Sequence, residues 1–237
     1  MQRYFCNTIN DNQFILSNDD SYHIKTVMRM QINDLIEVIY NKDLYICEIK
    51  EFDPVIVCIK EKINSYNELD INVTICQSLV KEQKMDLILQ KGTELGAYSF
   101  IPLSVKNSII KYSNKDFDKK RIRWQKIVKE ASEQSKRNII PEVLEIKEIK
   151  DIIKLNYDLK ILCTVNEVST SLKYVLQNNK KCDKMIIVIG PEGGFTKEEE
   201  GELINHGFVS VTLGNLVLRT ETASLCALSM INYEYER

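Results

Sequence analysis

The sequence has few of the residues on which several common kinds of enzyme site depend. A metal site or a Ser-His-Asp triad would need one of its only two histidines, and neither His23 nor His206 lies in a suggestive cluster. The seven cysteines are scattered and form no Cys-x-x-Cys pair, which favours reduced thiols over a disulfide framework or a zinc site. We therefore expect no metal centre.

The chain also lacks long apolar runs. No stretch approaches the roughly 20 apolar residues that cross a bilayer, and the start, Met1–Cys6, has no apolar core of a signal peptide. Its 237 residues, 44% hydrophobic and 28% charged, suit one large globular domain or two small ones. We expect a cytoplasmic protein with no membrane partner.

The net charge of -2 is a mild argument against a nucleic-acid partner, but the charge is unevenly distributed. Between Lys81 and Arg137 there are 14 basic and 7 acidic residues. This excess is compatible with contacts to RNA phosphates, and a solvated helical face explains it about as well.

Residues 1–68 have the pattern of a small β-barrel domain. Asn41–Asp43 is a natural hairpin turn, and 64–70 is a polar linker. The predicted strands are short and rich in β-branched and aromatic residues: Gln13–Leu16, Leu35–Tyr40, Leu44–Ile49 and Val55–Ile59.

From Ile71 to the end of the chain, apolar strand-like runs alternate with helical stretches. Helices are predicted at Glu82–Leu95 and Phe117–Ser135. Such alternation is typical of an α/β fold with a mostly parallel sheet covered on both faces. The predicted strands are Val73–Leu79, Ser99–Leu103, Leu159–Thr164, Met185–Ile189 and Phe208–Leu213.

A glycine-rich loop follows the predicted strand Met185–Ile189. Its sequence is Gly190-Pro191-Glu192-Gly193-Gly194-Phe195-Thr196. Glycine allows a close approach of the backbone to a ligand, and open α/β sheets bind ligands at the carboxyl ends of their strands. Thr196 and Glu199 have the spacing of a capping box, so a helix is predicted to begin here and to end near Gly207.

Three interpretations of this loop stay open. It is a plain tight turn, a phosphate loop, or part of a pocket for a neutral or cationic ligand. Glu192 would repel phosphate and no Gly-Lys-Ser/Thr follows, whereas an acidic residue suits a cation. Taken alone, the loop favours the plain turn.

A second unusual segment, Gly214–Ala223, follows the last predicted strand. Leu216, Val217 and Leu218 are too apolar for an exposed loop, so we expect them to line a pocket. Thr220 is placed to cap a final helix that runs to about Tyr235. Arg219, between buried leucines and a helix start, needs a partner, either a structural carboxylate or an anionic or carbonyl group beside the pocket.

Several motifs together resemble the bacterial family that methylates N3 of a uridine in 16S ribosomal RNA, in the SPOUT class of methyltransferases. The most specific pieces are Gly190–Gly194 and Leu218–Ala223. The resemblance covers nearly the whole chain and also rests on Arg3-Tyr4-Phe5, His23 with Val27-Met28-Arg29-Met30, Lys84-Met85-Asp86, Gln90–Gly96, Arg123-Trp124, and Glu133–Asn138 with Pro141.

This resemblance implies a PUA-like RNA-binding barrel at residues 1–68 and a trefoil-knotted SPOUT domain at residues 71–237. It implies S-adenosyl-L-methionine as cofactor, 16S ribosomal RNA of the small subunit as substrate, and a homodimer. The implied cofactor-binding residues are Ile189, Gly190, Glu192, Gly193, Leu213, Gly214, Leu216, Leu218, Thr222 and Ala223.

The implied chemistry requires loss of the imide proton of uridine and stabilisation of the charge that spreads to its carbonyl oxygens. Arg219 and Arg137 are the candidates for that stabilisation. Glu221 is the candidate general base, although an acid in the first turn of a helix is the more ordinary interpretation. The residues implied in RNA binding are Arg3, Arg29, Lys91, Gln134 and Arg137.

Two rival functions remain at this stage. One is a non-catalytic RNA-binding protein with the same fold, against which the complete glycine loop and the Leu218–Ala223 segment argue. The other is a nucleotide-phosphate enzyme, for which the sequence has no P-loop lysine and no obvious metal site.

Overall fold

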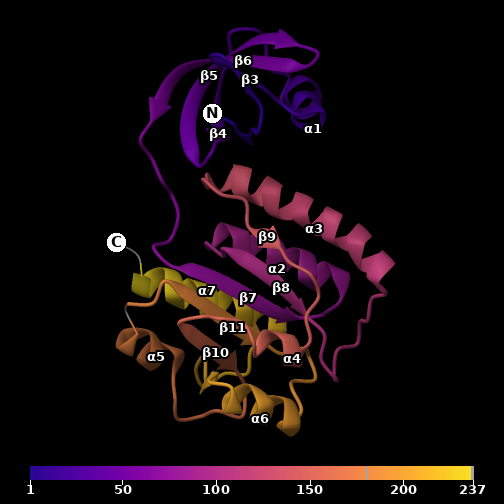
Figure 1. Ribbon diagram of the computed structural model, residues 1–237, viewed down its shortest axis with the longest axis vertical. Helices are drawn as coiled ribbons and strands as arrows, with labels where there is room; N and C mark the ends of the chain where they lie inside the picture. Colours follow the sequence, from indigo (N-terminus) through magenta and orange to yellow (C-terminus); the bar gives the residue numbers. More distant parts are fainter. Residues whose placement is uncertain (180, 236–237) are drawn as a thin grey trace. The chain divides into compact units, whose positions relative to one another are not determined.

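The computed structural model describes residues 1–179 and 181–235, and the chain divides into two compact units (Figure 1). The first unit contains residues 1–68 together with 132–139. The second contains residues 69–131 and the chain from Ile140 onward. The end of the predicted helix Phe117–Ser135 thus belongs to the first unit, together with residues 136–139 that follow it.

The first unit is built on a curled six-stranded sheet of order β1-β4-β5-β6-β3-β2. All its strand pairs are antiparallel except β1 with β4. The four predicted strands are present; β1, β2 and the two helical turns are too short to give a periodic signal. The bounds are β1 (Arg3–Phe5), β2 (Ile9–Asn10), β3 (Gln13–Ile15), α1 (Asn18–Tyr22), the π-helix η1 (His23–Val27), β4 (Leu35–Tyr40), β5 (Asp43–Phe52) and β6 (Val55–Ile63).

Buried polar contacts attach residues 132–139 to this sheet. The Arg137 guanidinium and the Glu68 carboxylate form an ion pair of 2.5 Å, and both side chains are almost fully buried. Glu68 also accepts hydrogen bonds from the backbone N–H groups of Asn138 and Ile139. Arg3, paired with Glu37 at 2.8 Å, donates to the Arg137 carbonyl oxygen.

The second unit contains a six-stranded sheet of order β12-β10-β11-β7-β8-β9, in which every strand pair is parallel. This confirms the predicted α/β fold with a parallel sheet. The last strand is shorter than predicted, since it ends at Val211. The bounds are β7 (Asn72–Ser78), β8 (Ser99–Leu103), β9 (Glu142–Val143), β10 (Leu159–Cys163), β11 (Lys184–Ile189) and β12 (Val209–Val211).

Helices cover both faces of this sheet (Figure 1). Side chains alternate along β11: Ile187 packs with α2, α3, α5 and α7, whereas Ile186 and Val188 pack with α4 and α6. Among the described residues, no helix is both long and apolar enough to span a membrane. The helices are α2 (Glu82–Glu94), α3 (Asn114–Gln134), α4 (Ile149–Ile152), α5 (Leu172–Asn178), α6 (Lys197–Asn205) and α7 (Thr220–Tyr235).

The predicted capping box is present at the start of α6. The Thr196 hydroxyl accepts from the Glu199 N–H at 3.2 Å, and the Glu199 carboxylate accepts from the Thr196 N–H at 2.9 Å. The helix is followed by Gly207 at a φ of 86°, which also agrees with the sequence prediction.

We expect Thr196→Ala to lower the free energy of unfolding by about 1 kcal/mol, because the backbone N–H of Glu199 at the helix start loses its partner, the Thr196 hydroxyl. Chemical denaturation measures this. Ser171→Ala, which removes the single N-cap bond of α5, is the matched control and should cost no more. A Thr196→Ala variant as stable as the parent would mean that the box contributes nothing.

Candidate cofactor and substrate site

Three neighbouring strands of the second unit end at the same level. Cys163 of β10 is in register with Ile189 of β11 and with Val211 of β12. The three loops that follow these strands therefore start side by side at one edge of the sheet. This is the edge at which parallel sheets bind ligands.

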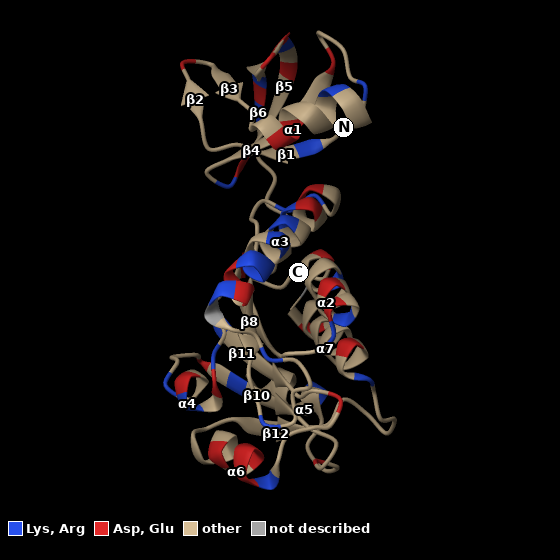
Figure 2. Ribbon diagram, turned by 90° about the vertical axis from the view of Figure 1, so that its right-hand side faces the viewer, with Lys and Arg blue, Asp and Glu red and all other residues tan. Residues whose placement is uncertain are grey.

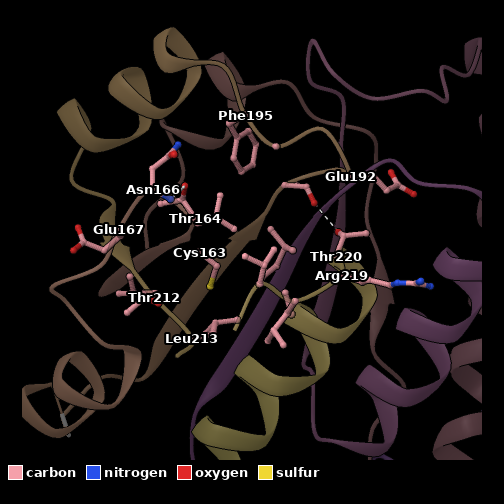
Figure 3. A pocket seen from close by; sticks show the side chains of 18 of the residues that line it. Cys163, Thr164, Asn166, Glu167, Glu192, Phe195, Thr212, Leu213, Arg219 and Thr220 are labelled. Atoms are coloured by element: carbon pink, nitrogen blue, oxygen red, sulfur yellow. Dashed lines mark hydrogen bonds between the residues drawn. The ribbon is translucent and has the colours of Figure 1, made fainter. Parts of the chain in front are cut away.

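A pocket of about 840 Å³ lies between these loops (Figure 3). Its size is within the range of small-molecule sites. It is lined by the last residue of each strand, Cys163, Ile189 and Val211, and by the segments that follow: residues 164–168, the glycine loop from Gly190 to Phe195, and residues 212–220. Lys84, Glu200 and Ala223 complete the wall.

The glycine loop owes its shape to Asn107 as well as to its own glycines. The Asn107 amide donates to the carbonyl oxygens of Gly193 and Gly194 at 3.2 and 3.1 Å. A Cβ on Gly193 would lie 3.3 Å from the Asn107 Cβ. The tight contact at position 193 is thus with Asn107, which would have to shift slightly to admit a side chain, whereas the sequence suggested a close approach to a ligand.

Open space in the pocket adjoins two other glycines. Gly194 and Gly214 have φ values of 66° and 132°, which favour glycine, and a Cβ on either would meet no atom within 4 Å. Backbone rather than side chains therefore forms these parts of the wall. A ligand can approach the main chain there and bond to its polar groups.

An ammonium group joins two of the predicted site residues. The Lys84 Nζ lies 2.9 Å from Glu192 in the glycine loop and 3.2 Å from Glu221 at the start of α7. Burial is the largest single effect and raises the pKa of Glu192. The hydrogen bond and charge of Lys84, a backbone hydrogen bond and the charge of Lys81 together outweigh it, so the pKa lies below its usual value. The hydrogen bond to Glu192 likewise raises the pKa of Lys84. Lys84 was expected only as part of the family motif Lys84-Met85-Asp86, and the sequence did not predict it in the site.

The loop after β10 contributes polar groups that sequence reasoning missed. Thr164 donates to the Glu200 carboxylate at 2.5 Å, and the Asn166 amide donates to both of its oxygens. Hydrogen bonds from Ser169 and from the backbone of Thr170 lower the pKa of Glu167 to about 2. The sequence could have indicated this loop as part of the site, because it follows a predicted parallel strand just as the glycine loop does.

The apolar segment after β12 lines the pocket as predicted, but its leucines are not buried. Leu216 and Val217 are 80% and 83% exposed. The environment expected for Arg219, between buried leucines, is therefore wrong. Arg219 is itself exposed, and within the described part of the chain no carboxylate pairs with it. In Figure 3 its side chain extends away from Cys163 and Leu213.

Thr220 has a different role from the predicted helix cap. It is the first residue of α7, and its hydroxyl donates to the Gly190 carbonyl oxygen at 2.6 Å. The hydroxyl accepts in turn from the Gln77 amide at 2.9 Å. Thr220 thus connects the final helix to the start of the glycine loop.

Known proteins share both units of the chain. Residues 67–232 match the family of the RNA methyltransferase domain, and residues 16–59 match the RNA methyltransferase PUA domain. Ribosomal RNA small subunit methyltransferase E of Bacillus subtilis is 36% identical over 100% of this chain and 98% of its own length. The Aquifex aeolicus protein of the same name is 32% identical over 93% of this chain and 94% of its own.

The chain belongs to the ribosomal RNA small subunit methyltransferase E family.

Solved structures of this family have the same fold. A Neisseria gonorrhoeae methyltransferase E, bound to S-adenosyl methionine, matches with a TM-score of 0.90 and 28% identity over 99% of this chain and 98% of that one. A Legionella pneumophila putative methyltransferase in complex with the same cofactor matches with a TM-score of 0.89 and 26% identity over 98% and 96%. The predicted combination of a PUA-like unit with a SPOUT-type domain is thus confirmed.

The pocket brings together most of the cofactor-binding residues that the family resemblance implies. Thr222 is exposed on α7, and neither Thr222 nor Glu221 is among the described residues that line the pocket. Glu221 pairs with Lys84, which does line it. The residues that do line it are Ile189, Gly190, Glu192, Gly193, Leu213, Gly214, Leu216, Leu218 and Ala223.

The residues implied in RNA binding are divided between two environments. Arg3 and Arg137 are each 3% exposed and hold the first unit together through Glu37 and Glu68. Arg29, Lys91 and Gln134 are accessible to solvent. Lys91 also pairs with Glu94 at 2.8 Å on the same helix.

Ion pairs neutralise part of the basic excess between Lys81 and Arg137. Both signs of charge lie on α2 and on α3 (Figure 2). Arg123 lies 2.9 Å from Glu82 and 2.5 Å from Asp86, and Lys120 lies 2.9 Å from Glu82. These ion pairs fit the solvated helical face that the sequence left as one of two alternatives.

Proposed function

We propose that this chain is an S-adenosyl-L-methionine-dependent methyltransferase that acts on N3 of a uridine in 16S ribosomal RNA of the small subunit. The observation that carries the proposal is the pocket formed by three loops at the carboxyl ends of β10, β11 and β12. Relatives that are crystallised with this cofactor support it. The cofactor supplies an electrophilic methyl group on a positively charged sulfur.

The residues of the pocket suit such a ligand. Glycine backbone at 194 and 214 leaves room beside the main chain, and Leu213, Leu216 and Leu218 offer apolar surface. Among the charged residues that line it, the carboxylates of Glu167, Glu192 and Glu200 outnumber the cationic groups of Lys84 and Arg219. This excess of negative charge favours a cation.

We assign the chemistry at the uridine to Arg219 and Glu221. The Arg219 guanidinium, which no carboxylate of the described residues neutralises, is available to the carbonyl oxygens of the uracil, where negative charge develops as the imide proton leaves. Glu221, held 3.2 Å from Lys84, is the candidate to accept that proton. Arg137 is given a structural part, because its guanidinium is buried against Glu68.

The test is direct. The purified protein is incubated with methyl-labelled S-adenosyl-L-methionine and small ribosomal subunits that lack the modification, and the nucleosides are separated by mass spectrometry. We expect 3-methyluridine. A methyl group on ribose or on a purine would contradict the acceptor atom, and a chain that binds RNA but not the cofactor in calorimetry would establish the non-catalytic alternative.

We propose that the first unit binds RNA through exposed basic residues. Arg29 is the candidate, because its side chain is exposed in the structure. Arg29→Ala should weaken RNA binding and reduce the slope of log K against log salt by about 1, because one phosphate contact is lost. Lys62→Ala is the control, since Lys62 pairs with Asp43 at 2.7 Å in the same unit. Equal salt slopes for Arg29→Ala and the parent would exclude Arg29 as a phosphate contact.

We also propose a homodimer in the cytoplasm. The exposed apolar side chains of Leu216 and Val217 beside the pocket support it, because a second copy would remove them from water. Light scattering at working concentrations measures the mass. A monomer at every concentration would contradict the dimer.

A further inference from the structure

A buried polar network adjoins the pocket, and one of its side chains, Thr220, also lines it. It is formed by Gln77 near the end of β7 and by Thr220 and Ser224 of α7, whose side chains are at most 6% exposed. The Gln77 amide donates to the Thr220 hydroxyl at 2.9 Å, and Ser224 donates to the Gln77 carbonyl oxygen at 2.5 Å. These side chains connect a strand and a helix that lie far apart in the sequence.

The direction of the hydrogen bonds from Gln77 to Thr220 and from Thr220 to Gly190 is fixed. The backbone carbonyl oxygen of Ser78 lies 3.1 Å from the Gln77 amide nitrogen, and it accepts but has no proton to give. The NH₂ group of Gln77 must therefore face Ser78 and Thr220. Because the Thr220 oxygen accepts from this amide, its single proton is directed to the Gly190 carbonyl oxygen, 2.6 Å away.

The last bond of the network acts on the pocket itself. Gly190 is the first residue of the glycine loop, and both Gly190 and Thr220 line the pocket, whereas Gln77 does not. The Gly190 peptide is thus held in one orientation by a hydroxyl whose own proton is oriented by Gln77. A main chain fixed in this way presents the loop to a ligand without reorganisation on binding.

We propose that Gln77 is a positioning residue of the cofactor site, which acts through Thr220 on the Gly190 peptide. The inference rests on the proposed function, since it takes the pocket to be the site of S-adenosyl-L-methionine. A buried amide costs free energy unless all its groups are paired, so an apolar side chain would fill this space at less cost if packing were its only role.

Gln77→Met tests the proposal, because methionine has a similar length and shape but cannot donate to Thr220. The binding of S-adenosyl-L-methionine to the full chain is measured by calorimetry, and stability by thermal melting. Thr74→Val is the matched control. Thr74 is in the same strand as Gln77 but does not line the pocket, and the substitution removes its side-chain hydrogen bonds with Ser99 at 2.8 Å and with Tyr157 at 3.1 Å.

We expect both variants to lose stability. Only Gln77→Met should also lose cofactor affinity, by about tenfold, which is the size of effect that the loss of one well-placed hydrogen bond has. A double-mutant cycle shows the route. In a Thr220→Val background, Gln77→Met should weaken binding by no more than a further factor of about two, since its effect passes through the hydroxyl that is already gone.

Thr220→Val and Thr220→Ser decide the matter even if Gln77→Met does not fold. Valine removes the hydroxyl at constant shape and should weaken binding about tenfold, whereas serine keeps the hydroxyl and should restore it. The proposal is overturned if Thr220→Val or Gln77→Met binds like the parent, or if their effects multiply. A parent chain that does not bind the cofactor would refute the proposed function instead.

Discussion

Replacement of Arg219 by alanine should reduce methyl transfer by about a hundredfold or more, while the protein remains folded and keeps its cofactor affinity to within about tenfold. Arg219 is exposed at the wall of the pocket, next to the start of α7, and within the described residues no carboxylate neutralises it. Its removal therefore leaves no buried charge behind and should have little effect on stability.

Arg219→Lys separates charge from geometry. Lysine keeps the positive charge but lacks the planar fork that binds two acceptors at once, so its turnover should also fall well below that of the parent. Arg123→Ala, an exposed arginine of α3 paired with Glu82 and Asp86, is the control and should retain its turnover. A transfer assay with tritiated cofactor, a thermal melt and calorimetry measure the three properties.

The result that contradicts this assignment is equally definite. If Arg219→Ala transfers methyl groups at the rate of the Arg123→Ala control, the guanidinium does not stabilise the transition state. If it melts far below the parent, Arg219 has a structural partner in the folded protein, and the loss of turnover would then reflect unfolding.

Replacement of Arg137 by alanine should have the opposite effect, a loss of about 3–5 kcal/mol of stability, because the Glu68 carboxylate would stay buried without its counter-ion. Glu68 is also held by the backbone N–H groups of Asn138 and Ile139, so it cannot easily turn to solvent. The loss should be concentrated in the first unit.

Thermal unfolding gives the overall effect, and hydrogen exchange of the amides of β4 and β5 shows whether the first unit opens first. Lys136→Ala is the matched control. It removes the neighbouring ion pair between Lys136 and Glu37. Because the Lys136 side chain is 39% exposed, this should lower the free energy of unfolding by less than about 1 kcal/mol.

The same experiment tests the catalytic role that the family resemblance gives to Arg137. An Arg137→Ala variant as stable as Lys136→Ala, with turnover lowered about a hundredfold, would restore Arg137 to the site as a charge-stabilising group. A large loss of stability, with cofactor affinity unchanged in the fraction that remains folded, supports the structural part.

Much of the fold was predictable from local patterns. Apolar runs at Leu35–Tyr40 and Ser99–Leu103 coincide with β4 and β8, and the capping box at Thr196 begins α6 as expected. These features depend on residues within a few positions of one another. The shortest elements, such as β9 and α4, escaped prediction because two to four residues carry no period.

The site was predictable in part. The loops after the predicted strands Met185–Ile189 and Phe208–Leu213 line the pocket, since the end of a parallel strand is marked in the sequence. The burial of individual side chains was not. Leu216 is apolar yet exposed, and Arg137 is charged yet buried. In both cases hydrophobicity alone gave the wrong environment.

The sequence by itself determined the class of fold, the two kinds of unit and the loops that carry the site, because periodicity, glycine and capping residues act locally. Only the tertiary structure decided which side chains meet. It joined Lys84 to Glu192 and Glu221, Gln77 to Thr220, and Arg137 to Glu68 across 69 to 143 residues of chain. The physical reason is that an ion pair or hydrogen bond depends on distance and burial in space, and sequence separation specifies neither.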